Sequence, residues 1–157
     1  MDGFVPTTGT VSDLASMRRI DEVELRILRL HGEVSPSLGG TIESCPVTHH
    51  FTPGLYCREI FMPKDMVITS RVHRYRHPFV VSQGKCMVYM GGQGEESWTP
   101  ISAPHFGITE PGTRRVLVIL EDTVWTTFHV TNETDVEKIA ADILVPYENP
   151  LLKEVTQ

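Results

Sequence analysis

Between Thr41 and Val130 the chain is a succession of short β-rich runs, separated by turns that contain glycine and proline. Short strands with no helix between them predict an antiparallel sheet folded as a sandwich or a barrel. The expected strands are Thr41–Cys45, Leu55–Met62, Met66–His73, Phe79–Ser82, Lys85–Met90, Ser97–Ser102, Phe106–Thr109, Arg114–Leu120 and Thr123–Val130. The expected turns include Pro53–Gly54, Pro63–Asp65, Gln83–Gly84, Gly91–Gly94, Pro111–Gly112 and Glu121–Asp122. The predicted fold class is therefore all-β.

A helix is expected on each side of this region. Ser12 is the expected N-cap of a first helix that runs from Asp13 towards His31, with apolar residues recurring at steps of three or four. Val23, Leu25 and Ile27 also alternate, which leaves a strand open for its second half. A capping box of Thr134 and Glu137 predicts a second helix, which Pro146 ends.

The chain has 157 residues, which fits one domain with a sizeable core. We expect an N-terminal tail and helix over 1–40, a β-barrel over 41–131, and a C-terminal helix and tail over 132–157. The apolar stripe of the first helix and the pair Leu151–Leu152 indicate a homodimer.

Composition excludes several classes of protein. The formal net charge of −6 argues against sequence-independent binding of nucleic acid, which needs a basic face. No apolar run is long enough for a membrane span, and the N-terminal residues do not form a signal peptide, so a cytoplasmic protein is expected. The three cysteines are few and widely spaced, which is typical of reduced thiols.

Histidines are concentrated in the β-rich region, and neutral imidazole is the commonest metal ligand. His73 and His77 would point to one face of a regular strand but lie about 13 Å apart, too far for one metal ion. A bend at Tyr75–Arg76 would bring them together.

His129 ends the run that follows Glu121–Asp122. If that pair forms a tight hairpin turn, counting outward places Arg114 opposite His129, and the far end of the hairpin beside Pro111–Gly112.

The stretch from Pro63 to His129 resembles the two-motif core of the cupins. Their first motif reads G-x5-H-x-H-x3/4-E-x6-G. On this chain its second histidine is His73, its glutamate position holds His77 and its final glycine is Gly84. The chain departs from the motif where Asp65 replaces the opening glycine, Arg71 replaces the first histidine and His77 replaces the glutamate.

The second cupin motif matches at Pro111–Gly112, but Arg115 occupies its histidine position. The blocks Tyr56–Lys64 and Glu121–His129 look like small cupin-like proteins of phage and bacterial genomes, which have no established activity. The resemblance implies a single antiparallel jelly-roll barrel.

By the same resemblance, His73, His77 and His129 would hold one divalent ion: iron, zinc, nickel or manganese. Glu59 is the candidate fourth ligand or general base. The expected substrate-binding residues are Arg58, Arg71, Arg115, Tyr75 and His105. Guanidinium groups bind carboxylate or phosphate bidentately.

The resulting hypothesis is a metal-dependent enzyme of dioxygenase, isomerase or lyase type that acts on a small polar or anionic molecule. The alternative is a non-catalytic binding protein, or a phage-associated structural or accessory protein, with a degenerate metal site.

Overall fold

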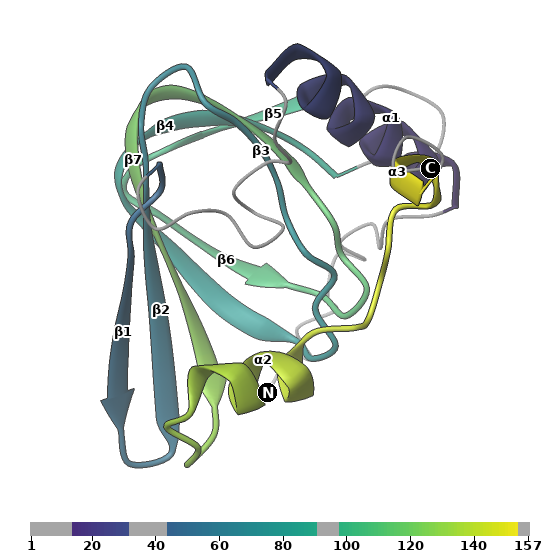
Figure 1. Ribbon diagram of the computed structural model, residues 1–157. Coiled ribbons are helices and arrows are strands. Elements are labelled where there is room, and N and C mark those ends of the chain that lie inside the picture. Colours follow the sequence, from purple (N-terminus) through teal and green to yellow (C-terminus); the bar gives the residue numbers. More distant parts are fainter. Residues whose placement is uncertain (1–13, 32–43, 91–97, 154–157) are drawn as a thin grey trace, which may run out of the picture.

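The computed structural model describes residues 14–31, 44–90 and 98–153. Its strands are β1 (Val47–Thr52), β2 (Leu55–Met62), β3 (Val67–Thr69), β4 (His77–Tyr89), β5 (Trp98–Ser102), β6 (His105–Thr109) and β7 (Val116–Val130). Its helices are α1 (Leu14–His31), α2 (Val136–Ile143) and α3 (Pro150–Lys153), as Figure 1 shows. The mostly antiparallel β-structure confirms the predicted β-rich body. Along the chain, α1 precedes this body and α2 and α3 follow it.

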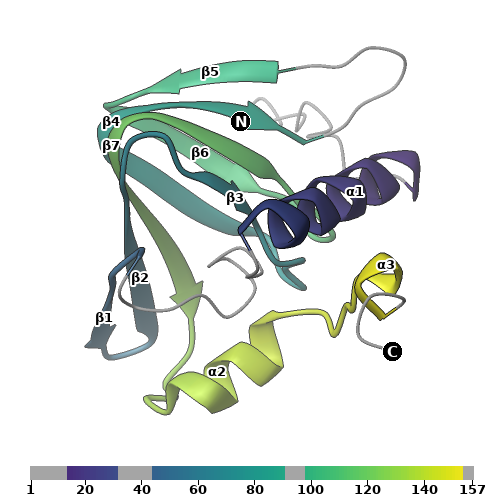
Figure 2. The ribbon, with the colours of Figure 1, turned by 45° about the horizontal axis from the view of Figure 1, so that its top comes forward.

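Two long strands organise the sheet. The last residues of β7 pair with β2 and its first residues pair with β3, while β4 runs antiparallel to β7 along most of its length. β4 pairs with β6 through its first residues and with β5 through its last. Figure 2 shows β4 and β7 curving along their length. The sheet therefore has two halves that share β4 and β7, one with β1, β2 and β6 and the other with β3 and β5. Among the described residues no pairing joins the outer strands to each other, and closure into a barrel stays a prediction.

The prediction of turns at Glu121–Asp122 and Gln83–Gly84 is wrong. Both pairs lie inside long strands, and the register between β4 and β7 shifts between Val81 and Cys86. Glycine and aspartate favour turns, but here they lie in a β-bulge, which inserts an extra residue and bends the strand. Gly84 has a φ of 89°, and a side chain there would collide with Asp122 and Thr123.

The expected register of His129 opposite Arg114 is wrong for the same reason. With no hairpin turn at Glu121–Asp122, His129 pairs with Tyr56 of β2 instead.

Other strand limits also differ from expectation. β1 occupies a segment expected to be a loop, since its residues are nearly all exposed at the sheet edge and show no clear apolar alternation. Met66–His73 contracts to β3, whereas the expected strand Leu55–Met62 is β2. Of the expected strand Thr41–Cys45, only Ser44 and Cys45 lie within the described residues, where they form a turn.

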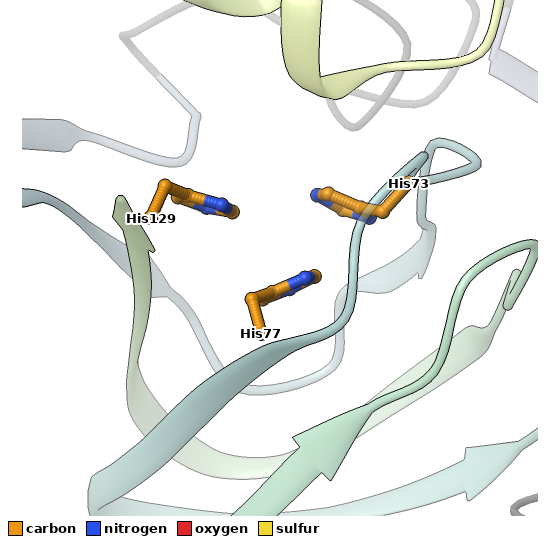
Figure 3. Close-up of side chains that lie close together, drawn as sticks. All are labelled: His73, His77 and His129. Atoms are coloured by element: carbon orange, nitrogen blue, oxygen red, sulfur yellow. The ribbon is translucent and has the colours of Figure 1, made fainter. Parts of the chain in front are cut away.

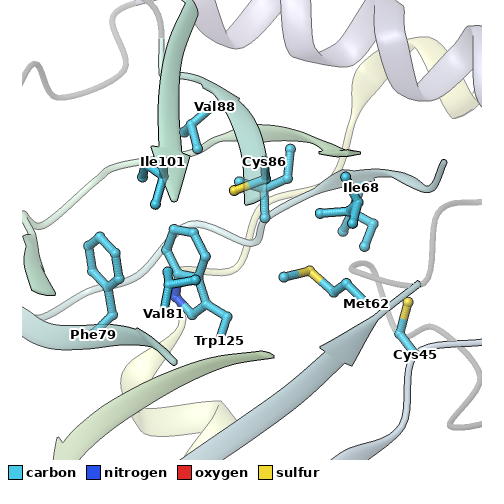
Figure 4. Close-up of a cluster of buried hydrophobic side chains, with 11 residues drawn as sticks. Cys45, Met62, Ile68, Phe79, Val81, Cys86, Val88, Ile101 and Trp125 are labelled. Carbon is cyan, nitrogen blue, oxygen red and sulfur yellow. The ribbon is translucent and has the colours of Figure 1, made fainter. Parts of the chain in front are cut away.

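The main core lies between the two halves of the sheet (Figure 4). It contains Cys45, Met62, Ile68, Phe79, Val81, Cys86, Val88, Ile101, Leu117, Ile119 and Trp125. The rings of Phe79 and Trp125 stack with their centroids 4.4 Å apart. All three cysteines, Cys45, Cys57 and Cys86, are free thiols, as predicted.

Helix α1 is attached to the sheet by a buried ionic network. Arg114 bonds Asp21 at 2.7 Å and also contacts Glu24. Glu24 in turn accepts hydrogen bonds from Thr69 at 2.7 Å and from Asn149 at 2.8 Å. The network therefore joins α1, β3, the segment just before β7 and the segment before α3.

Helix α2 begins one residue later than the predicted capping box. Its N-cap is Asp135, whose side chain accepts hydrogen bonds from the amides of Glu137 and Lys138. Its buried residues Ile139 and Ile143 pack on Tyr56. No helix within the described ranges is both long enough and apolar enough to span a membrane.

Candidate metal centre and its cavity

His73, His77 and His129 come together from two segments of the chain, the bend that leads into β4 and the end of β7. His77 is the first residue of β4, His129 is the penultimate residue of β7, and His73 lies just before β4. Their potential ligand atoms all lie within 4.8 Å of one another. The ring centroids are 4.5 Å apart for His73 and His77, and 4.6 Å for His77 and His129. Figure 3 shows the three rings directed towards a common point.

A bend before β4 makes this possible, as predicted, and it falls at Arg74–Tyr75. Hydrogen bonds to neighbouring segments hold it. The Arg74 amide donates to the carbonyl of Ile143 at 2.7 Å, and the Gly112 amide donates to the carbonyl of His73 at 2.9 Å. The end of α2 and the Pro111–Gly112 turn thus fix the position of His73.

Hydrogen bonding determines which nitrogen of His77 is free. Its Nδ1 lies 3.0 Å from the carbonyl oxygen of Tyr75, which can only accept, so Nδ1 carries the proton. Its Nε2 therefore has a lone pair, and this atom is buried without a hydrogen-bond partner in the described structure. A histidine whose second nitrogen donates to a carbonyl is typical of metal ligands.

The other two histidines complete the set. Nδ1 of His73 is also buried and has no partner among the described residues. Nε2 of His129 lies 3.0 Å from the hydroxyl of Thr127. Orphaned buried nitrogens are costly unless something binds them. These residues therefore fit a metal ion.

The imidazoles are neutral at pH 7. Burial, followed by the neighbouring His77 and His129, lowers the pKa of His73 to about 3. Burial, followed by His77 and Arg58, lowers the pKa of His129 to about 4. Burial also lowers the pKa of His77, against the opposing effect of its bond to the Tyr75 carbonyl. Metal binding requires this neutral form.

The cluster opens into a cavity of about 310 Å³. Its wall is arranged in levels along β2 and β7. Tyr56 lies opposite His129 at the first level, Arg58 opposite Thr127 at the second, and Ile60 opposite Trp125 at the third. Successive levels are about 7 Å apart along a strand. Helix α2 adds an apolar wall beside the histidines.

Of the residues predicted to bind substrate, Arg58, Arg71 and Arg115 line the cavity. The other two do not. Tyr75 is 48% exposed and donates its hydroxyl proton to Asp142. His105 lies on β6 outside the cavity wall, with its ring 5.8 Å from that of Phe79.

The structure does not bring Glu59 to the histidines. Arg58 and Ile60 of β2 line the cavity, and adjacent residues of a strand point to opposite faces. Glu59 therefore lies on the far face, which corrects its expected role as ligand or base.

Sequence reasoning missed Tyr56 and His49. Nδ1 of His49 lies 2.6 Å from the Tyr56 hydroxyl, both residues line the cavity, and the Tyr56 ring stacks on His129 at 5.9 Å. Burial, against an opposing effect of Arg58, raises the pKa of Tyr56. The alternation of Tyr56 with Arg58 on one strand was a usable signal. His49 offered none, because β1 was not recognised as a strand.

No family model matches the sequence, and no curated protein matches it. Similar solved structures include a protein of unknown function from Vibrio parahaemolyticus, with 16% identity over 56% of this chain and 89% of that one, and a TM-score of 0.48. KdgF from Halomonas sp. has 18% identity over 56% of this chain and 82% of that one, with a TM-score of 0.46. A cupin-2 domain protein from Shewanella frigidimarina has 7% identity over 54% of this chain and 79% of that one, with a TM-score of 0.43. Cupins are thus among the proteins that this chain resembles, and the likeness carries no inference about activity.

Proposed function

We propose that this chain is a metal-binding protein of the cupin type, in which His73, His77 and His129 hold one divalent ion. The observation that supports this is the convergence of three neutral imidazoles, two of them with buried and unpartnered nitrogens. Imidazole suits iron, zinc and nickel, and a divalent ion held by three histidines keeps positions for other ligands. A bound ion would supply a Lewis acid at the cavity wall.

We further propose that the protein is an enzyme acting on a small molecule in this cavity. Its volume of about 310 Å³ is at the lower end of the range for small-molecule sites. The Tyr56–His49 pair is the candidate for moving a proton, because it reaches the cavity and Glu59 does not.

The metal test uses protein purified without a polyhistidine tag, analysed for bound metal as wild type, His73→Ala, His77→Ala and His50→Ala. His50 is the matched control, since it is exposed on β1 and outside the cavity wall. We expect close to one ion per chain in wild type and His50→Ala, and loss of most of it in the other two. Wild-type protein that stays metal-free after reconstitution would refute the proposal.

A non-catalytic metal-binding role is the second candidate. It is favoured by the described part of the cavity wall, which contains no aspartate or glutamate to act as a base. Cobalt(II) substitution separates the two roles. A site open to substrate should change its visible absorption when azide is added, whereas a closed structural site should not.

A further inference from the structure

The cavity wall carries an excess of positive charge. Arg58, Arg71 and Arg115 all line it, and no acidic side chain does so in the described ranges. Among the ion pairs found between described residues, none involves these three arginines. By contrast, Arg114 is buried and fully paired with two carboxylates.

Arg115 is the most unusual of the three. It is only 7% exposed, and its guanidinium lies over the rings of Phe79 and Trp125, 5.3 and 5.9 Å from their centroids. Burial lowers the pKa of Arg115 to about 10, so the group is still charged at pH 7. A buried cation is costly unless it is paired, and aromatic faces compensate only part of that cost.

Arg58 lies at the second level of the cavity, one step along β2 from Tyr56 and the histidines. Burial lowers its pKa also, Tyr56 opposes this, and the neighbouring Arg71, which is exposed, acts in the same direction as burial. Arg58 and Arg115 are thus the two less exposed cations of this wall, and an anion bound in the cavity would stabilise both.

We propose that Arg58 and Arg115 form a binding subsite for the oxyanion of a small organic acid, below the level of the three histidines. The subsite deepens the proposed function, because it assumes that the cavity is the ligand site, but it does not require the metal. The acid has a carboxylate or phosphate group, which guanidinium binds bidentately.

The other residues of the cavity wall indicate the chemistry of the part of the ligand that carries no acid group. Ile60, Leu117 and Trp125 line one part of the cavity, and Ile139 and Ile143 of α2 line another. These side chains offer no hydrogen bonds to a second strongly polar group, apart from the Trp125 N–H. The ligand is therefore an acid with an apolar part, and the hydroxyl groups of Ser70, Thr109 and Thr127 on the same wall can bond a further polar group.

Tryptophan fluorescence provides the test. The chain has two tryptophans, so Trp98→Phe leaves Trp125, which lines the cavity beside Arg115, as the only reporter. The metal-free protein is titrated with benzoate, phenyl phosphate and benzamide. Benzamide matches benzoate in size and lacks the charge.

We expect at least one of the two anions to bind at millimolar or lower concentration, and benzamide to bind at least about tenfold more weakly. The tighter anion identifies the group as carboxylate or phosphate. Failure of both anions to change the signal, or equal binding of benzamide, would overturn the proposal. Both results are independent of the metal content, so failure of the subsite and failure of the metal site are distinguishable.

Two variants assign the subsite to its residues. Arg58→Met and Arg115→Met should each weaken anion binding at least about tenfold and leave benzamide binding unchanged. Arg76→Met is the control, because Arg76 pairs with Glu110 outside the cavity wall. Near-UV circular dichroism verifies folding. If Arg115→Met does not fold, Arg58→Met decides, and an unchanged affinity in that variant would refute the assignment.

Discussion

Replacing Arg114 with methionine should destabilise the metal-free protein by about 3 to 5 kcal/mol at pH 7, because it leaves two buried carboxylates without their cation. Arg114 is 1% exposed, Asp21 is 4% exposed and Glu24 is fully buried. Neither carboxylate can turn towards water without moving α1 away from the sheet.

The expected loss of stability follows from what can compensate the two carboxylates once the Arg114 guanidinium is removed. Asp21 keeps its hydrogen bond from Tyr147, and Glu24 keeps those from Thr69 and Asn149. The remaining charge can be removed by taking up a proton, and neutralising an ordinary carboxylate at pH 7 costs about 4 kcal/mol. That value sets the scale of the expected loss. Because protonation becomes easier in acid, the difference between Arg114→Met and wild type should shrink from pH 7 to pH 5.

Urea denaturation followed by circular dichroism measures both effects. Arg18→Met is the matched control, because Arg18 pairs with Glu22 on the exposed face of α1 and should change stability by at most about 0.5 kcal/mol. Adding Glu24→Gln to Arg114→Met should recover part of the loss. A loss no larger than that of Arg18→Met, or a loss that does not depend on pH, would refute the reasoning.

Two further predictions concern acid and the β-bulge. The metal-free protein should lose stability as the pH falls from about 6.5 towards 4. The unfolded chain takes up protons at His73 and His129, whereas the folded chain, with pKa values of about 3 and 4 at these residues, does not. The double variant His73→Gln/His129→Gln should show a flatter curve of unfolding free energy against pH, and a slope equal to that of the wild type would contradict this. Gly84→Ala should lower the melting temperature more than Gly54→Ala. Both glycines have positive φ, which costs alanine about 1 kcal/mol, but only at Gly84 would the new methyl group meet backbone atoms of the facing strand. Equal decreases in melting temperature would contradict the bulge geometry.

The sequence alone predicted the β-rich body, a helix before and after it, and the pair His73–His77, whereas His129 was added to the cluster only through the resemblance to cupins. Apart from His129, these features are local. Strand and helix patterns repeat over a few residues, and the His73–His77 pair lies within a single short segment. The bend that joins these two histidines was also predictable, because no regular strand could bring them to one ion.

The wrong assignments share a different cause. Glu121–Asp122 and Gln83–Gly84 have the composition of turns, and the same residue types occur in β-bulges. Whether such a pair reverses the chain or only bends it depends on the partner strand, which a local pattern does not reveal. The register of His129 depended on that choice.

Only the tertiary structure decided which side chains share the cavity. The pairing of β2 with β7 places Arg58 and Tyr56 on the inner face and Glu59 on the outer one, and a shift of one residue would reverse both. The partners of Arg114 lie in α1, 90 or more residues away. The residues of this chain determine which groups can ionise or bind a metal, but contacts between distant segments determine which charges are paired in the core and which remain free in the cavity.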